Sequence, residues 1–516
     1  MARKPQSVRA RLIAPVRRAS EVPAGFVRQV FPVVNVLAFV VMLFSLTMAI
    51  PLALSWYQHD AALYAYDEAI AYTMGGGLLA WLVSVRFRRE LQARDGFLLV
   101  SLVWTVIPAC ATLPLIFYYA QTPTPLSFVD AYFETVSGLT TTGATVLTGL
   151  DVLPPSINLW RHLLVWLGGM GVIVLAVAVL PLLGVGGSQL YRAETAGPIK
   201  DSKLTPRIAE TAKGLYGVYV AITVACILCF RVAGMTWFDA VCHAFSTMGL
   251  GGFSTHDASF AYFSHRPWID FVAIVFMTIA SVNFAMHFLA WRKKSFAPYF
   301  SCPEARWVLF TLIGGSTVVS LYIYANGLTT GLAQAFREGF FNTISVASTT
   351  GFASVDYERW PIPITLFMIL LSVFATSSGS TGGGIKMIRA IVVLKLARRE
   401  LARALHPKLV SPVRLGEAAV DANVLYAIFA FLLLYSATIF IAAFVLMFSG
   451  LDAKSSFTAV LACINNMGPG LGVVGPSTNY QALDDLQVAV CTVVMLLGRL
   501  ELITLLVPLT PTFWRK

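Results

Sequence analysis

The sequence predicts an all-α polytopic membrane protein that contains four helix–pore-loop–helix repeats. Three observations lead to this prediction: an apolar composition, basic residues confined to certain segments, and a polar glycine-containing run that occurs four times. Of the 516 residues, 57% are hydrophobic and 12% are charged, whereas soluble domains carry about 25% charged residues. A helix needs about 20 apolar residues to cross a bilayer. Several stretches reach that length, including 31–56, 157–183, 268–291 and 486–508.

The basic residues predict how the chain is oriented in the membrane. Most of the 37 Lys and Arg residues fall in the segments 3–28, 86–94, 192–213, 292–306, 386–414 and 515–516. Intervening segments such as 57–65 and 118–156 lack them. Because loops rich in Lys and Arg stay in the cytoplasm, we expect both termini to be cytoplasmic and the number of crossings to be even. The net charge of +11 thus reflects topology and predicts no nucleic-acid partner.

Neither the cysteines nor the N-terminal residues have the pattern of a secreted protein held together by disulfides. The seven cysteines lie mostly within apolar stretches, and Cys226 and Cys229 form a C-x-x-C without a second pair. Helix packing is therefore favoured there over a redox or zinc site. The basic N-terminal residues lack the short apolar core of a signal peptide, which predicts a retained cytoplasmic tail.

A short polar run recurs about every one hundred residues. Its copies read SGLTTTGAT (137–145), STMGLGGFS (246–254), SVASTTGFA (345–353) and ACINNMGPG (462–470). The seventh position is glycine in each copy, at Gly143, Gly252, Gly351 and Gly468. Self-similarity at a regular spacing indicates a repeated structural unit. Ordinary polar turns between helices are the alternative, and four copies in register disfavour it.

Each polar run follows a short amphipathic stretch that we expect to form a half-helix. Thirteen residues before the four glycines lie Asp130, Asp239, Glu338 and Ser455, which suit the first turn of a helix. Non-helical backbone at membrane depth must line a watery cavity or be buried in protein. Four such loops around one axis could direct carbonyl oxygens at a cation, as in a selectivity filter. Glycine permits the positive φ that this requires.

These motifs resemble the bacterial Trk/Ktr potassium transporter family along nearly the whole chain. The resemblance is carried by GLTTTGAT, GGFSTHDAS, TTGFAS, NNMGPGLGVV, YRAETAGPIKDSKLTPRIAETAK, GSTGGGIK and GRLELITLLVPLTPTFWR. It implies a single-chain pseudo-fourfold pore, preceded by two extra transmembrane helices, with ten crossings of the bacterial cytoplasmic (inner) membrane. It also implies a homodimer and a TrkA-like cytoplasmic nucleotide-binding ring protein as partner.

The resemblance also divides the chain and places the ion. The implied parts are an N-terminal tail with a two-helix hairpin (1–95) and pore repeats at 96–200, 201–303, 304–415 and 416–516. The K⁺-binding residues implied are Thr141, Thr142, Gly143, Leu250, Gly251, Gly252, Thr349, Thr350, Gly351, Asn466, Met467 and Gly468. The second run is rich in glycine and the fourth contains Asn-Asn-Met and a proline. We therefore expect K⁺ to be favoured over Na⁺ less strictly than in channels with a T-V-G-Y-G filter.

A glycine-rich segment is a candidate gate. Residues 376–386 read TSSGSTGGGIK, and each glycine costs a helix about 1 kcal/mol relative to alanine. The resemblance implies an intramembrane loop beneath the filter, with the gate residues Gly379, Ser380, Thr381, Gly382, Gly383 and Gly384. A Walker phosphate loop is excluded because Ile385 and Met387 flank the lysine. A flexible hinge without a role in conduction is the alternative.

Arg499 is the second candidate gate residue. It lies deep in the apolar stretch VVMLLGRLELITLLV, where an arginine is costly unless it faces water or a partner. We expect it to face the pore and repel a cation that leaves the filter. The alternative is a structural ion pair, for which Glu501 is poorly spaced.

The sequence predicts a transporter and no enzyme. It contains no H-E-x-x-H, G-x-S-x-G or true Walker motif, and we expect no cofactor. The first hypothesis is potassium uptake by a protein embedded in membrane lipid. The basic segments 192–213 and 386–414 would then offer a docking surface for the ring protein. The alternatives are the channel-like subunit of a K⁺-pumping ATPase and a non-conducting scaffold. His243 and His256 flank the second run as possible pH sensors. Glu134 and Asp130 could attract cations to the outer entrance, while Glu134 could also support its half-helix and Asp130 could cap the helix dipole; the two kinds of role are compatible.

Overall fold

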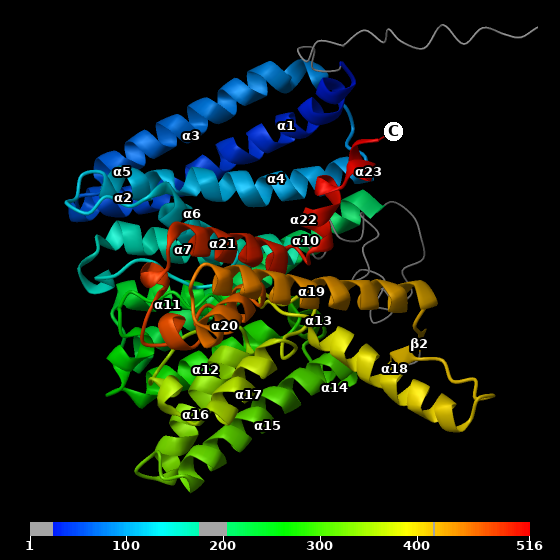
Figure 1. Ribbon diagram of the computed structural model, residues 1–516. Coiled ribbons are helices and arrows are strands. Elements are labelled where there is room, and N and C mark those ends of the chain that lie inside the picture. Colours follow the sequence, from blue (N-terminus) through cyan, green and yellow to red (C-terminus); the bar gives the residue numbers. More distant parts are fainter. Residues whose placement is uncertain (1–23, 175–203, 416–417, 516) are drawn as a thin grey trace, which may run out of the picture.

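The computed structural model describes residues 24–174, 204–415 and 418–515, which form an almost entirely helical bundle (Figure 1). Within these residues the sole sheet is an antiparallel pair of two-residue strands, β1 (Arg414–Leu415) and β2 (Ala418–Ala419). The predicted all-α class is confirmed.

Two N-terminal helices form a hairpin along one side of the bundle (Figure 1). α1 (Ala24–Ser45) continues into α2 (Ala49–Gln58) and is followed by α3 (Leu63–Ser84). Gly77 of α3 allows close packing, because a Cβ there would lie 2.8 Å from Met42 Cγ. The hairpin joins the first repeat through the Tyr66 hydroxyl, which donates to the Ser156 carbonyl at 2.9 Å. These are the two extra helices that the sequence predicts.

The rest of the chain forms four repeats of first helix, half-helix and second helix. The first helices are α4 (Ala93–Ala111) with its short continuation α5 (Leu113–Tyr119), α10 (Leu204–Ala233), α15 (Pro303–Ala325) and α19 (Ala422–Phe448). The half-helices are α6 (Phe128–Leu139), α11 (Trp237–Gly249), α16 (Leu332–Ala347) and α20 (Ala453–Ile464). The second helices are α7 (Pro155–Val174), α12 (Pro267–Ser281) with α13 (Phe284–Lys293), α17 (Ile362–Ser372) with α18 (Met387–Leu405), and α21 (Asp485–Arg499) with α22 (Ile503–Leu506).

Three of the four half-helices begin as predicted. The side chains of Ser127, Thr236 and Asp452 cap α6, α11 and α20 by accepting from the amides of Asp130, Asp239 and Ser455, each at 3.0 Å. The prediction for Glu338 is wrong. α16 begins six residues earlier, at Leu332, after Gly331, so Glu338 lies beyond the first turn.

The second helix of repeats two, three and four is interrupted. α12 and α13 meet at 95°, and α21 and the segment Ile503–Leu509 meet at 111°. The expectation that 268–291 and 486–508 are continuous spans is therefore wrong. Val282 is extended and the Asn283 side chain caps α13, while Glu501 and Leu502 adopt positive φ. These local conformations end each helix at membrane depth.

Six helices of the described residues are long and apolar enough to cross a membrane, and counting the bent pairs raises this number to eight. α7 is described only to Val174, so ten crossings remain a prediction. α1 begins at the end of the bundle where α23 (Pro511–Trp514) also lies (Figure 1). An even number of crossings requires the two ends of the chain to lie on the same side of the membrane, and this arrangement agrees with it.

Candidate functional site

The four polar runs adopt one backbone conformation. Each half-helix is followed by a non-glycine residue with positive φ: Thr141 (55°), Leu250 (57°), Thr349 (64°) and Asn466 (52°). The next amide donates to the carbonyl five residues back, as in Thr142 N to Ser137 O at 2.8 Å. This is the Schellman arrangement, which usually uses glycine. A residue with a Cβ costs about 1–2 kcal/mol in this conformation. Such backbone strain is retained only where the surrounding structure holds the residue in place, which is common at functional sites.

The glycines of the four polar runs close a ring. Gly143, Gly252, Gly351 and Gly468 have φ of 79°, 61°, 88° and 95°. A Cβ added to each would meet a backbone carbonyl oxygen of the next repeat, and the fourth repeat returns to the first. These oxygens belong, in the same order, to Gly251, Thr350, Met467 and Thr142. The predicted filter residues are thus brought together around one axis in the sequential order of the repeats.

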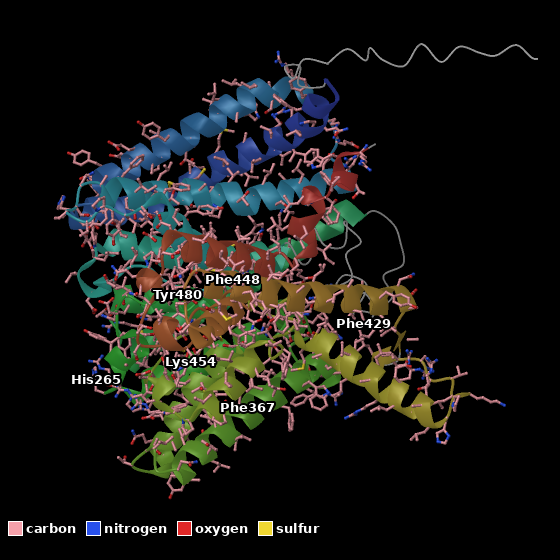
Figure 2. The ribbon with its side chains drawn as sticks, viewed as in Figure 1. His265, Phe367, Phe429, Phe448, Lys454 and Tyr480 are labelled. Carbon is pink, nitrogen blue, oxygen red and sulfur yellow. The ribbon has the colours of Figure 1, made fainter. Side chains whose placement is uncertain are left out.

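A partly open cavity of about 80 Å³ lies against the ring. All four filter glycines line it, together with the residues that follow them, among them Ala144, Phe253, Ala353 and Pro469. Tyr480, labelled in Figure 2, lies between α20 and α21 and also lines the cavity. Its hydroxyl donates to the Gly468 carbonyl at 2.8 Å. The cavity therefore forms a mouth that leads to the ring.

Hydroxyl and amide groups hold the runs in place. Thr140 and Thr142 share a hydrogen bond of 2.7 Å, and Ser348 and Thr350 share the same bond in the third repeat. The Asn466 amide donates to Thr142 Oγ1 at 3.0 Å, which joins the fourth repeat to the first. Thr141 Oγ1 and Asn466 Oδ1 are buried without a partner among the described residues. Buried polar atoms normally have one, so these two oxygens remain available to a ligand.

A buried ion pair that the sequence analysis missed supports the first run. Arg161 Nε of α7 lies 2.8 Å from Glu134 Oε1 of α6, and both side chains are 1% exposed. Glu134 also accepts from the Val146 amide at 3.1 Å, and the Arg161 guanidinium lies over the Phe253 ring at 4.3 Å. Glu134 therefore supports its half-helix and does not face the mouth as a cation attractor. The sequence does hold one indication of this ion pair, because an arginine within the second helix of the first repeat requires a partner.

Replacing Glu134 with glutamine is expected to destabilise the protein by about 3–5 kcal/mol, because Arg161 is left buried without its counter-charge. Retention of a monodisperse peak after heating of the purified protein measures this. The matched control is Asp356→Asn, which breaks an ion pair whose arginine, Arg359, is 84% exposed. Exposed pairs contribute about 0–1 kcal/mol. Equal heat resistance of the two variants would contradict the structural role of Glu134.

Residues 373–386 form the loop between α17 and α18, which packs against the ring. The Gly383 amide donates to Thr349 Oγ1 at 2.9 Å, and Thr381 Oγ1 donates to the Met248 carbonyl at 3.0 Å. A Cβ on Gly383 would overlap the Asn465 carbonyl. The loop therefore contacts repeats two, three and four directly below their filter runs. All six predicted gate residues of the loop lie in this segment.

Arg499 lies beside the same loop. Its guanidinium donates to the Thr381 carbonyl at 2.8 Å and to the Gly168 carbonyl of α7 at 3.3 Å. The side chain is buried, and among the described residues no carboxylate forms an ion pair with it. The structural ion pair considered for Arg499 is therefore not formed here. Glu501 instead pairs with Arg389 of α18.

Two further charged residues hold the loop: Lys386, which ends the glycine-rich segment, and Glu304, which the sequence analysis did not place there. Lys386 Nζ donates to the Gly382 carbonyl, and Glu304 Oε1 of α15 accepts from the Ser378 amide at 2.6 Å. Lys386 itself has a φ of 78°. Contacts from α15 and from the start of α18 thus fix both ends of the loop.

His256 lies in the loop that follows the second run. Its ring contacts the carboxylate of Asp151 in the first repeat, and its Nε2 lies 3.5 Å from Asp239 Oδ1. Burial lowers the pKa of His256, but the carboxylates of Asp239 and Asp151 outweigh burial and raise this pKa above its usual value. His243, by contrast, is buried between the Asp239 carbonyl and Ser254 Oγ.

The charged His256 is expected to stabilise the contact between the first two repeats. Because its pKa is raised on folding, this stabilisation is complete below the unfolded pKa of about 6.5 and is lost as the pH rises through the folded pKa. Heat resistance of the purified protein should therefore fall as the pH rises above about 6.5 and through the raised pKa of His256. His256→Gln should show a smaller fall. An unchanged pH profile in that variant would contradict the assignment.

The fold and the ring define a class of membrane transport protein in which four inequivalent repeats surround one central ion pathway. The sequence profile of the TrkH family, described as a cation transport protein, matches residues 68–515. The chain belongs to this family. Because the family is one of transporters, the prediction that the protein is not an enzyme is confirmed.

Individual relatives match over nearly the whole chain. The Trk system potassium uptake protein TrkH of Halomonas elongata is 43% identical over 94% of this chain and 99% of the relative. TrkH of Escherichia coli (strain K12) is 41% identical over the same shares. The crystal structure of the potassium transporter TrkH from Vibrio parahaemolyticus superposes with a TM-score of 0.87 at 38% identity, covering 94% of this chain and all of that one.

Proposed function

We propose that the protein takes up K⁺ across the bacterial cytoplasmic (inner) membrane as the membrane component of a Trk system. The closed ring of four strained backbone runs carries this proposal, because backbone carbonyls arranged around an axis can replace the hydration shell of a cation. The full-length matches to Trk system potassium uptake proteins support it. No match favours the subunit of a K⁺-pumping ATPase, and that alternative is not retained.

In this proposal K⁺ meets the runs 141–143, 250–252, 349–351 and 466–468, and the protein uses no cofactor of its own. The unpartnered Thr141 Oγ1 and Asn466 Oδ1 add side-chain oxygens in two of the repeats. Leucine and methionine supply backbone oxygens only, at Leu250 and Met467. We expect such an uneven ring to select K⁺ over Na⁺ less strictly than four identical runs would, because fewer of its layers consist of four equivalent carbonyl oxygens.

The loop 379–384 and Arg499 form the gate in this proposal. The loop lies directly below the ring, and the hydrogen bond from Arg499 to the Thr381 carbonyl ties it to α21. A buried positive charge at this point opposes a cation that leaves the ring. Opening then requires the loop to move away from the Thr349 hydroxyl and the Arg499 guanidinium.

A TrkA-like cytoplasmic ring protein is the proposed partner, and the protein is proposed to act as a homodimer with both termini in the cytoplasm. α18 supports the docking proposal, because it projects from the bundle at the end where α23 lies (Figure 1). It carries exposed basic residues, among them Lys395 and Arg398. The other predicted docking segment, 192–213, lies largely outside the described residues.

The first test is ⁸⁶Rb⁺ or K⁺ flux into proteoliposomes that contain the purified protein alone, under an imposed potential and without a proton gradient. A membrane potential drives a cation inward by about 2.3 kcal/mol per 100 mV. Flux that follows the potential supports an ion pathway that needs neither H⁺ nor Na⁺. If flux is absent, the ring protein with nucleotide is added. Absence of flux under both conditions, with or without a proton or sodium gradient, contradicts the proposed function.

A further inference from the structure

A second cavity lies away from the ring, beside the bend between α12 and α13. It has a volume of about 660 Å³, is open to the surface, and lies between α10, α12, α13, α14 (Ala297–Ser301) and α15. Its wall is mainly apolar and includes Ile222, Ile279, Val282 and Leu309. In a membrane protein an apolar cavity of this kind faces hydrocarbon chains and not water.

Aromatic and basic residues surround this cavity. Trp291 and Phe296 line it and are 61% and 76% exposed. Arg292, Lys293 and Lys294 are exposed at the end of α13, and among the described residues no carboxylate pairs with any of them. Exposed aromatic rings beside Lys and Arg are typical of the cytoplasmic membrane interface.

Lys294 occupies a backbone position that favours glycine. Its φ is 47°, and it caps the C-terminus of α13, where its amide donates to the Ala290 and Trp291 carbonyls. A lysine is strained in this conformation, because its Cβ lies close to the backbone. The basic side chain is thus kept at the rim of the cavity at the expense of local stability.

The cavity adjoins the bend that holds the intramembrane loop. His287 lines the cavity and joins the Ile279 carbonyl of α12 to the Tyr299 hydroxyl at 2.9 and 2.7 Å. Just past the bend, the Phe284 amide donates to the Gly379 carbonyl of the loop at 3.2 Å. A molecule in this cavity would therefore pack against the element that supports the loop.

We propose that this cavity binds one anionic phospholipid of the cytoplasmic leaflet. An acyl chain occupies the apolar space, and the phosphate lies near Arg292, Lys293 and Lys294. Three unpaired cations select a negative headgroup, because each basic residue near an anionic lipid surface strengthens binding about fivefold. This inference does not depend on which ion the ring conducts.

Quenching of Trp291 by brominated lipid tests the proposal. The purified full chain in neutral detergent is titrated with brominated phosphatidylglycerol, and brominated phosphatidylcholine serves as the uncharged comparison. We expect saturable quenching by the anionic lipid at concentrations where the neutral lipid has little effect, and we expect Trp291→Phe to remove that component. Lys294→Gln should weaken binding about fivefold, and adding Lys293→Gln should weaken it about fivefold again.

Lys408→Gln is the matched control, because it removes one exposed charge from the connection after α18 and does not line the cavity. It should leave the titration unchanged. Equal quenching by the two lipids, or equal weakening by Lys408→Gln and Lys294→Gln, would overturn the proposal in favour of nonspecific attraction. Absence of quenching at Trp291 would overturn it as well, as expected if a second copy of the chain covers the cavity. Unchanged circular dichroism confirms that each variant is folded.

Discussion

Replacing Gly143 with serine is expected to lower K⁺ flux more than about tenfold and to remove the preference for K⁺ over Na⁺. Gly143 has a φ of 79°, and a Cβ there would overlap the carbonyl oxygen of Gly251 in the next repeat. The overlap involves backbone and cannot be relieved by a rotamer change. Displacing the ring costs more than the 1.4 kcal/mol that corresponds to a tenfold effect. Flux into proteoliposomes with K⁺ or Na⁺ outside measures both quantities.

Gly327→Ser is the control for this prediction. Gly327 has a φ of 67° in the connection after α15, but a Cβ there meets nothing within 4 Å. The control therefore carries the same backbone strain without the collision. Gly468→Ser, with a φ of 95° and the Thr142 carbonyl 2.7 Å from the added Cβ, should behave like Gly143→Ser. Wild-type selectivity in both filter variants would rule out the ring as the filter.

Replacing Arg499 with alanine is expected to raise K⁺ flux about tenfold in the absence of any partner. The substitution removes a buried positive charge below the ring and the hydrogen bond from its guanidinium to the Thr381 carbonyl. Both losses favour an open loop, and together they exceed the 1.4 kcal/mol of a tenfold change. Flux at matched protein density measures the effect, with the exposed Arg359→Ala as the control for loss of a positive charge.

Arg499→Lys separates the two contributions. Lysine keeps the charge but cannot donate in the forked geometry that reaches both Thr381 and Gly168. Low flux in the lysine variant would mean that the positive charge forms the barrier to K⁺. High flux would mean that the hydrogen bonds from Arg499 to the Thr381 and Gly168 carbonyls form it. Wild-type flux in Arg499→Ala would leave Arg499 as a structural residue, and the gate proposal would then rest on the loop alone.

The repeats were predictable from the sequence because their signals are local. A first-turn polar residue, a polar run and a glycine thirteen residues after that first-turn residue recur at near-constant spacing. Three of the four first-turn residues, Asp130, Asp239 and Ser455, lie where they were expected. Glu338 was misjudged because α16 extends four residues further towards its N-terminus than the other three half-helices do. A count from the glycine assumes equal helix lengths, which nothing in a single sequence guarantees.

The breaks in the second helices were predictable only where glycine marked them. The third repeat carries three consecutive glycines in its loop, and the break there was expected. The bends at Val282 and at Glu501 fall in segments that read as continuous apolar helix. Their positions depend on tertiary contacts, since the residues after the first bend bond to the loop through Phe284 and Glu501 pairs with Arg389.

The sequence by itself determined the class of protein, the number of repeats and the position of the four polar runs, because hydropathy, charge placement and glycine spacing are properties of neighbouring residues. Tertiary structure alone decided that the glycines interlock in a closed ring and that Arg161 neutralises Glu134 in the interior. It also decided that Arg499 bonds to the Thr381 carbonyl. Each of these contacts joins residues far apart in the chain, and their formation depends on how four repeats pack around one axis.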